Sequence, residues 1–156
     1  CRRYCGVLGD PLLGSDGEFG GGFGVFGGTD LQFHLPPEAV ALQLQFGLSP
    51  KADAGGCVQA KIFGDHNDAP LYASETVVGS KTTVVIDRIE LPRGDRDRWL
   101  RLVVDATPDN RPAGADPFDI RDFANWLEPL VTMDREWLEN RIGSEPSISP
   151  DTDADE

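Results

Sequence analysis

Alternation of apolar and polar side chains is the feature that most constrains the fold of this chain. Residues 31–35 read Leu-Gln-Phe-His-Leu, residues 40–46 read Val-Ala-Leu-Gln-Leu-Gln-Phe, and the same period of two recurs in residues 57–63 and 99–105. Successive side chains of a strand point to opposite faces of a sheet, so this period predicts strands with one buried face. No helical period of comparable length precedes residue 134. We therefore expect an all-β fold in which helix plays a minor part.

Turn-forming residues divide the chain between these strands. With 18 glycines and 12 prolines in 156 residues, the sequence is typical of an antiparallel β-sandwich with many short connections. Near the C-terminus, Asp134 suits the N-cap of a short helix and Gly143 its end. The predicted segments are a lead-in over 1–13, the sandwich over 14–133, the helix over 134–143 and a disordered acidic tail over 144–156.

Charge and hydropathy exclude several classes of partner. Lys and Arg number 14 against 27 Asp and Glu, which gives a net charge of −13. This charge opposes binding to phosphate backbones, so nucleic acid is not expected as a partner. No apolar run approaches the roughly 18 residues of a membrane span, and membrane insertion is not expected either. Because the chain opens with Cys1 rather than Met, we expect it to be a piece of a longer protein.

No arrangement of catalytic side chains is recognisable in the sequence. The two histidines are His34, which falls on the polar phase of its strand, and His66, and neither pairs with a nucleophile. The many carboxylates show no pairing of the kind that a glycosidase needs. Three cysteines define no disulfide framework, and a bond between Cys1 and Cys5 stays open, whereas Cys57 suits a buried strand. The sequence therefore predicts a protein that is not an enzyme.

The stretch from Asp116 to Met133 combines aspartates, Asn125 and Trp126 with a following apolar run. A carboxylate-rich loop that enters an apolar segment predicts side chains that cap, chelate or bind, followed by a closing strand. The alternative is that Phe118, Phe123 and Trp126 belong to the core and the aspartates accept hydrogen bonds within turns.

A second polar loop, residues 65–68, reads Asp-His-Asn-Asp between two predicted strands of a hairpin. Its oxygens could contribute to a structural Ca²⁺ site, but Ca²⁺ takes six to eight oxygen ligands and the same residues also form ordinary turns. No cofactor is expected apart from this Ca²⁺ ion, and no residue is assigned to a metal.

Six segments in this order resemble the NPCBM family of carbohydrate-binding modules, which have a galactose-binding-like jelly-roll fold. The matching segments are Gly22–Gly28, Val40–Gly47, Gly56–Asp65, Leu71–Ser74, Trp99–Asp105 and Asp122–Trp126. The resemblance covers about residues 14–131. In the last segment, Phe123 and Asn125 replace polar and acidic residues that are usual in the family.

The resemblance implies a non-catalytic module that recognises glycan through loops at one end of a jelly roll. Aromatic rings would stack on pyranose rings, and polar side chains would hydrogen-bond to hydroxyl groups. Such a module would belong to a larger protein located outside the cell, in the periplasm or at the cell surface. The candidate ligand-binding residues are Asp65, His66, Asn67, Asp68, Tyr72, Arg111, Asp116, Asp119, Asp122, Asn125 and Trp126.

A different interpretation fits the same segments. The chain could be a structural or protein-interaction β-sandwich of a multidomain protein, with other domains as its partners and no small ligand. A solvent-facing aromatic residue beside Asp, Asn or Arg at a loop end would favour sugar binding, whereas a broad apolar patch would favour a protein partner.

Overall fold

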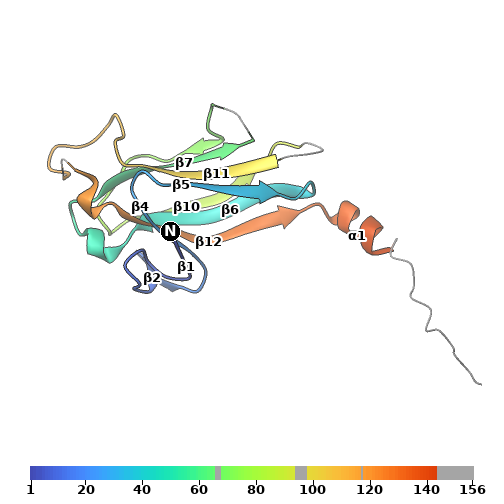
Figure 1. The fold of residues 1–156 in the computed structure, drawn as a ribbon, viewed down its shortest axis with the longest axis horizontal. Coiled ribbons are helices and arrows are strands. Elements are labelled where there is room, and N and C mark those ends of the chain that lie inside the picture. Colours follow the sequence, from blue (N-terminus) through green and yellow to red (C-terminus); the bar gives the residue numbers. More distant parts are fainter. Residues whose placement is uncertain (66–67, 94–97, 117, 144–156) are drawn as a thin grey trace, which may run out of the picture.

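The computed structural model shows two antiparallel β-sheets packed face to face, with one short helix beyond them (Figure 1). It describes residues 1–65, 68–93, 98–116 and 118–143, with the side chains of 142 and 143 left out. The tail over 144–156 lies outside these residues. The chain is an all-β antiparallel sandwich of the galactose-binding-like jelly-roll type with a short C-terminal helix, which confirms the fold class predicted from the alternation.

The first sheet contains five strands in the order β1-β4-β12-β6-β10. Its last strand in sequence, β12, occupies the centre and pairs with β4 on one side and β6 on the other. The strands are β1 (Arg2–Arg3), β4 (Gly22–Phe26), β12 (Phe123–Met133), β6 (Ala39–Leu48) and β10 (Thr83–Glu90).

The second sheet has the order β5-β11-β7-β8, and β9 also pairs with β7. The predicted hairpin after residue 63 is confirmed, because β8 pairs antiparallel with β7. The strands are β5 (Asp30–Leu35), β11 (Arg98–Asp105), β7 (Cys57–Gly64), β8 (Tyr72–Ala73) and β9 (Val77–Val78).

Smaller elements lie around the two sheets. A hairpin of β2 (Leu12–Gly14) and β3 (Gly17–Phe19) precedes the first long strand, and two 3₁₀ turns, η1 (Pro50–Ala52) and η2 (Asp119–Arg121), lie in loops. The helix α1 (Arg135–Gly143) follows β12 directly and points away from the sheets (Figure 1). Asp134 caps it as predicted, with its side chain accepting a hydrogen bond from the Trp137 amide at 3.2 Å.

The alternation in the sequence becomes the division between the core and the outer faces. Leu100, Leu102 and Val104 of β11 are buried against residues of β6 and β12, whereas their neighbours on β11 are only partly covered. Phe46 and Trp126 form the centre of this core, with ring centroids 4.6 Å apart. In β10, the alternation of apolar and polar residues changes phase between Ile86 and Ile89. The pairing of β10 with β6 shifts register at the same place.

The first thirteen residues are part of the sandwich rather than a separate lead-in. Arg2 and Arg3 pair with Gly24 and Phe23, and the side chain of Leu12 is buried. β1 consists of only two residues, Arg2 and Arg3, and two residues cannot show a period of two. The sequence pattern therefore does not reveal this strand.

Candidate functional site

The predicted site residues fall at opposite ends of β7. Asp122 accepts a hydrogen bond at 2.7 Å from the amide of Cys57, where β7 begins, and Asp65 follows Gly64, where β7 ends. Eight residues of extended strand separate these ends by about 25 Å. The structure therefore does not bring the two predicted loops into one site.

The loop at the Asp65 end opens onto a polar and aromatic surface on the outer face of the second sheet. In the register of this sheet, Trp99 of β11 lies opposite His34 of β5, and Arg101 lies opposite Gln32 on one side and Phe63 on the other. A hollow of about 330 Å³ on this face is lined by Gln32, Asp65, Trp99 and Arg101. We call these four residues with His34 the Trp99 site.

Asp65 joins the loop to Trp99 by hydrogen bonds in both directions. The Asp65 amide donates to the Trp99 carbonyl at 2.7 Å, and the Trp99 amide donates to Asp65 Oδ1 at 3.1 Å. Asp65 has a positive φ of 51°, a conformation that Asp and Asn tolerate better than most residues. Among the described residues, no hydrogen bond engages Asp65 Oδ2, so this oxygen can accept one from a ligand.

Arg101 is held flat along the same face. Its Nη2 donates to Asp30 Oδ2 at 2.6 Å, and its guanidinium carbon lies 5.2 Å from the centre of the Phe63 ring. The hydrogen bond with Asp30 raises the pKa of Arg101, and the charges of Asp30 and Asp68 raise it further. The charge of Asp68 thus acts on Arg101 from the predicted loop.

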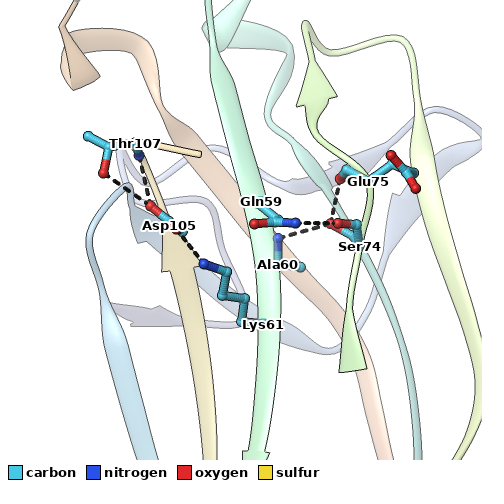
Figure 2. Close-up of polar contacts among 7 residues, drawn as sticks. All are labelled: Gln59, Ala60, Lys61, Ser74, Glu75, Asp105 and Thr107. Atoms are coloured by element: carbon cyan, nitrogen blue, oxygen red, sulfur yellow. Dashed lines mark hydrogen bonds and ion pairs between the residues drawn. The ribbon is translucent and has the colours of Figure 1, made fainter. Parts of the chain in front are cut away.

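The rest of this sheet face has its polar side chains paired with one another. Figure 2 shows Lys61 donating to Asp105, which also accepts hydrogen bonds from Thr107, and Gln59 donating to the carbonyl of Ser74. The Lys61 Nζ to Asp105 Oδ2 distance is 2.6 Å. Burial raises the pKa of Asp105, but the hydrogen bonds from Lys61 and Thr107 outweigh burial and lower it overall. These polar side chains are therefore engaged with one another.

The predicted residues of the loop over 106–122 stabilise the loop itself. Arg111 donates to the carbonyls of Ala106, at 2.8 Å, and of Asp116. Arg121 donates to both carboxylate oxygens of Asp116 at 2.6 and 2.9 Å, and this contact lowers the pKa of Asp116. Asp119 is exposed at the start of η2. Arg111 and Asp116 are therefore occupied with partners inside the loop.

Three predicted binding residues are buried, which corrects their assignment to a ligand-binding surface. Trp126 and Asp122 are 0% exposed and Asn125 is 1% exposed. Trp126 packs on Phe46 in the core, and Asn125 Nδ2 donates to the Leu13 carbonyl at 3.1 Å. Trp126 points into the core between the sheets, Asn125 points to the opposite face of β12, where β2 covers it, and Asp122 lies before β12 against the start of β7. The core interpretation is confirmed for Trp126 and is wrong for Phe118, which is 66% exposed.

Burial also raises the pKa values of the Asp122 carboxyl group and the Cys57 thiol. Desolvation raises the pKa of Asp122, the hydrogen bond from the Cys57 amide lowers it, and so does the charge of Arg111. Desolvation likewise raises the pKa of the Cys57 thiol. Cys1, Cys5 and Cys57 are free thiols in this structure, and Cys57 is buried as predicted.

The remaining predicted residues lie near β8 and in the 65–68 loop. Tyr72 is partly buried against the core, and desolvation raises its pKa. His66 and Asn67 lie outside the described residues. In the part of the chain that is described, no three His, Cys, Asp or Glu side chains come together in a group that could hold a metal ion. The Ca²⁺ ion accordingly stays a prediction without a defined site.

Trp99 is the main candidate that the sequence prediction missed. The signal was present, because Leu100, Leu102 and Val104 define the buried face of this strand and Trp99 precedes them on the opposite phase. A large aromatic residue on the polar phase of a strand, next to a charged loop, indicates a surface ring rather than a core ring.

Solved structures of similar fold come from Clostridium perfringens. A structure of CBM51-2 with GlcNAc and the INT domains of ZmpB superposes with a TM-score of 0.67 at 18% identity, over 91% of this chain and 30% of that one. The CBM51 of a GH95 protein in complex with methyl-galactose gives 0.66 at 14% identity, over 84% and 86% of the two chains. The chain thus spans less than a third of the ZmpB structure. Neither a protein-family model nor a curated protein matches the sequence.

These identities establish a shared fold and nothing further. The fold agrees with the galactose-binding-like sandwich that the NPCBM resemblance implies, and membership of that family stays a prediction. Among the described residues, no helix has the length and apolarity to span a membrane.

Proposed function

We propose that the chain is a non-catalytic carbohydrate-binding module whose ligand site is the Trp99 site. The proposal rests on one arrangement: a partly exposed tryptophan at a loop end, surrounded by a carboxylate, a guanidinium, an amide and an imidazole around a shallow hollow. The indole face can stack on the apolar face of a pyranose ring, and the polar groups can hydrogen-bond to its hydroxyls.

The electrostatics of the site favour a neutral sugar. Among the described residues that line the hollow, Arg101 is the one cation; it shares the hollow with Asp65, forms a salt bridge with Asp30 and is acted on by the charge of Asp68. A sialylated or sulfated glycan would bring a further negative charge to this surface, within a chain of net charge −13. The structural neighbours were solved with methyl-galactose and GlcNAc, both uncharged, and these are the natural first probes.

The module would act within a larger protein located outside the cell, at its surface or in the periplasm. Several solved structures of this fold are parts of longer chains, and one includes an M60 catalytic domain. The role we propose here is attachment to glycan, with no bond made or broken. Other domains of such a protein, together with carbohydrate, are the expected partners.

Calorimetric titration with methyl galactoside and with GlcNAc tests the proposal. Aromatic stacking and direct hydrogen bonds predict binding of one of these sugars, and Trp99→Ala is expected to weaken it at least tenfold. Trp137→Ala is the matched control, because Trp137 lies on α1 outside the sandwich. If neither sugar binds, or if Trp99→Ala and Trp137→Ala bind the sugar equally well, the Trp99 site is rejected.

A further inference from the structure

A long apolar groove runs beside the Trp99 site, on the other side of β5. One part of it, about 290 Å³, lies between the sheets, and its lining includes Phe23, Phe33, His34, Pro129, Val131 and Met133. It shares Phe23, Phe33 and Pro129 with a wider part of about 690 Å³ whose rim includes Tyr4, Arg3 and Glu128. We call the two parts together the seam.

The course of β12 leaves the seam open. β12 pairs with β4 only as far as Leu127 opposite Gly22, whereas it stays paired with β6 to Met133. A bulge at this point places Glu128 at a φ of +44°, and the Glu128 amide donates to the Gly21 carbonyl at 2.9 Å. Beyond the bulge, no described strand pairs with the outer edge of β12, and β5 is the edge strand of the facing sheet.

His34 connects the seam to the Trp99 site. Its ring packs at 90° against Trp99 with centroids 5.5 Å apart, and the same residue lines the narrow part of the seam. The neighbouring residue Phe33 points to the opposite face of β5, and its ring lies 5.4 Å from the Phe23 ring inside the seam. The Trp99 site and the seam therefore adjoin at His34, on the edge strand β5.

The composition of the seam selects what can occupy it. The narrow part offers aliphatic and aromatic side chains, with His34 as its one titratable residue. A second sugar ring would lose water from its hydroxyls without gaining hydrogen bonds there, which is costly. An alkyl or aryl group loses nothing on leaving water and gains from burial.

We infer that the seam takes the apolar aglycone of a glycoside whose sugar occupies the Trp99 site, so that the ligand is an amphiphilic glycoconjugate. This inference rests on the proposed function. The occupant is a lipid-like alkyl chain at the anomeric carbon, because the two parts of the seam share Phe23, Phe33 and Pro129 and so form one elongated groove. The chain would lie over Phe33 and Val131.

Titration of the whole chain with methyl, hexyl and phenyl glycosides of the sugar that it binds tests the inference. Burial of roughly two methylenes predicts that the hexyl glycoside binds about tenfold more tightly than the methyl glycoside. A gain with the hexyl glycoside supports the alkyl chain in the seam. A gain with the phenyl glycoside alone would overturn the inference.

Two valine variants make the test specific to the seam. Val131, 38% exposed, lines the seam, whereas Val78, 39% exposed, lies on β9 beside the start of β7 and lines neither part of the seam. Val131→Asp is expected to reduce the hexyl-to-methyl affinity ratio to about one, and Val78→Asp to leave it near ten. Thermal unfolding of both variants verifies that they fold.

Failure of the seam and failure of the sugar site give different results. Equal affinity of wild type for methyl, hexyl and phenyl glycosides overturns the seam and leaves the sugar site intact. Binding of no methyl glycoside overturns the proposed function and the seam with it. Hexyl binding that survives Trp99→Ala but is lost in Val131→Asp shows an apolar site independent of sugar, and this also overturns the inference.

Discussion

His34 and Trp99 stand opposite each other on neighbouring strands, with their rings perpendicular and their centroids 5.5 Å apart. This edge-to-face contact fixes the orientation of the indole on the sheet surface, because each ring limits the rotation of the other. The platform that would receive a sugar is thus positioned by a second aromatic side chain rather than by the loop alone.

Replacement of His34 by alanine should weaken sugar binding more than it weakens the fold. His34 is exposed, so we expect a change below about 0.5 kcal/mol in the free energy of unfolding. Loss of the ring frees Trp99 to rotate, and we expect affinity for the bound methyl glycoside to fall roughly threefold to tenfold. Titration together with urea denaturation measures both. A drop in stability that accounts for the lost binding would contradict the positioning role.

Arg98 should be among the most sensitive residues for stability. Its guanidinium is buried and donates to the carbonyls of Pro37 at 2.8 Å, of Ala39 at 2.9 Å and of Pro92. Arg98→Met keeps the length of the side chain but leaves these carbonyls unsatisfied, which should cost about 3 kcal/mol or more. Arg88→Met, at an exposed ion pair with Glu90, should leave the urea midpoint nearly unchanged in the same series.

Asp122 should make the fold less stable as pH rises through the acid range. Desolvation raises its folded-state pKa above the ordinary 3.8, so the folded state retains a proton that the unfolded state has released. Stability therefore falls between 3.8 and the folded-state pKa and stays lower above it. Asp122→Asn still accepts from the Cys57 amide and cannot ionise, so it should gain stability relative to wild type across this window.

Asp116 provides the control of opposite sign. The hydrogen bonds from Arg121 lower its folded-state pKa, so it contributes stability above 3.8 that disappears as pH falls through the lowered value. Asp116→Asn should lose stability relative to wild type as pH rises. Urea midpoints for both variants between about pH 3 and pH 7 check the pair. If the stability of both variants, relative to wild type, changes in the same direction as pH rises, the two predicted pKa shifts cannot both be right.

Gly22 should not tolerate a side chain. It has a φ of +142°, and a Cβ atom there would lie 2.1 Å from the Trp126 carbonyl oxygen. Gly17 has a similar φ of +139°, but a Cβ there meets no atom within 4 Å. Gly17→Ala should therefore cost about 1 kcal/mol from backbone strain alone, and Gly22→Ala roughly 3 kcal/mol or more. Equal thermal shifts in the two variants would show that the close approach is not what matters.

The period of two in the sequence predicted the fold well because it survives wherever one sheet face is buried. Leu100, Leu102 and Val104 are such a case. Where the alternation breaks before Ile89, the strand pairing breaks as well. The short pairing of Arg2 and Arg3 could not be predicted, because two residues define no period and their partners lie on β4. Long-range pairing of this kind is set by tertiary structure rather than by local pattern.

The site was harder to predict than the fold, for a physical reason. Polar loop residues serve either a ligand or the loop itself, and the sequence does not distinguish the two. Arg111 and Asp116 form hydrogen bonds within their own loop, whereas Asp65 keeps one carboxylate oxygen free among the described residues. Trp126 and Trp99 have the same chemistry, and only their strand phase separates a core ring from a surface ring.

The central position of β12 has a consequence for synthesis on the ribosome. A nascent chain that has emerged only as far as residue 122 displays β4 and β6 with a strand-wide gap between them, and both edges can pair with foreign chains. The Asn125 side chain must then find the Leu13 carbonyl, 112 positions earlier. The first sheet can therefore close only after translation has passed β12, and until then the unpaired edges of β4 and β6 are exposed.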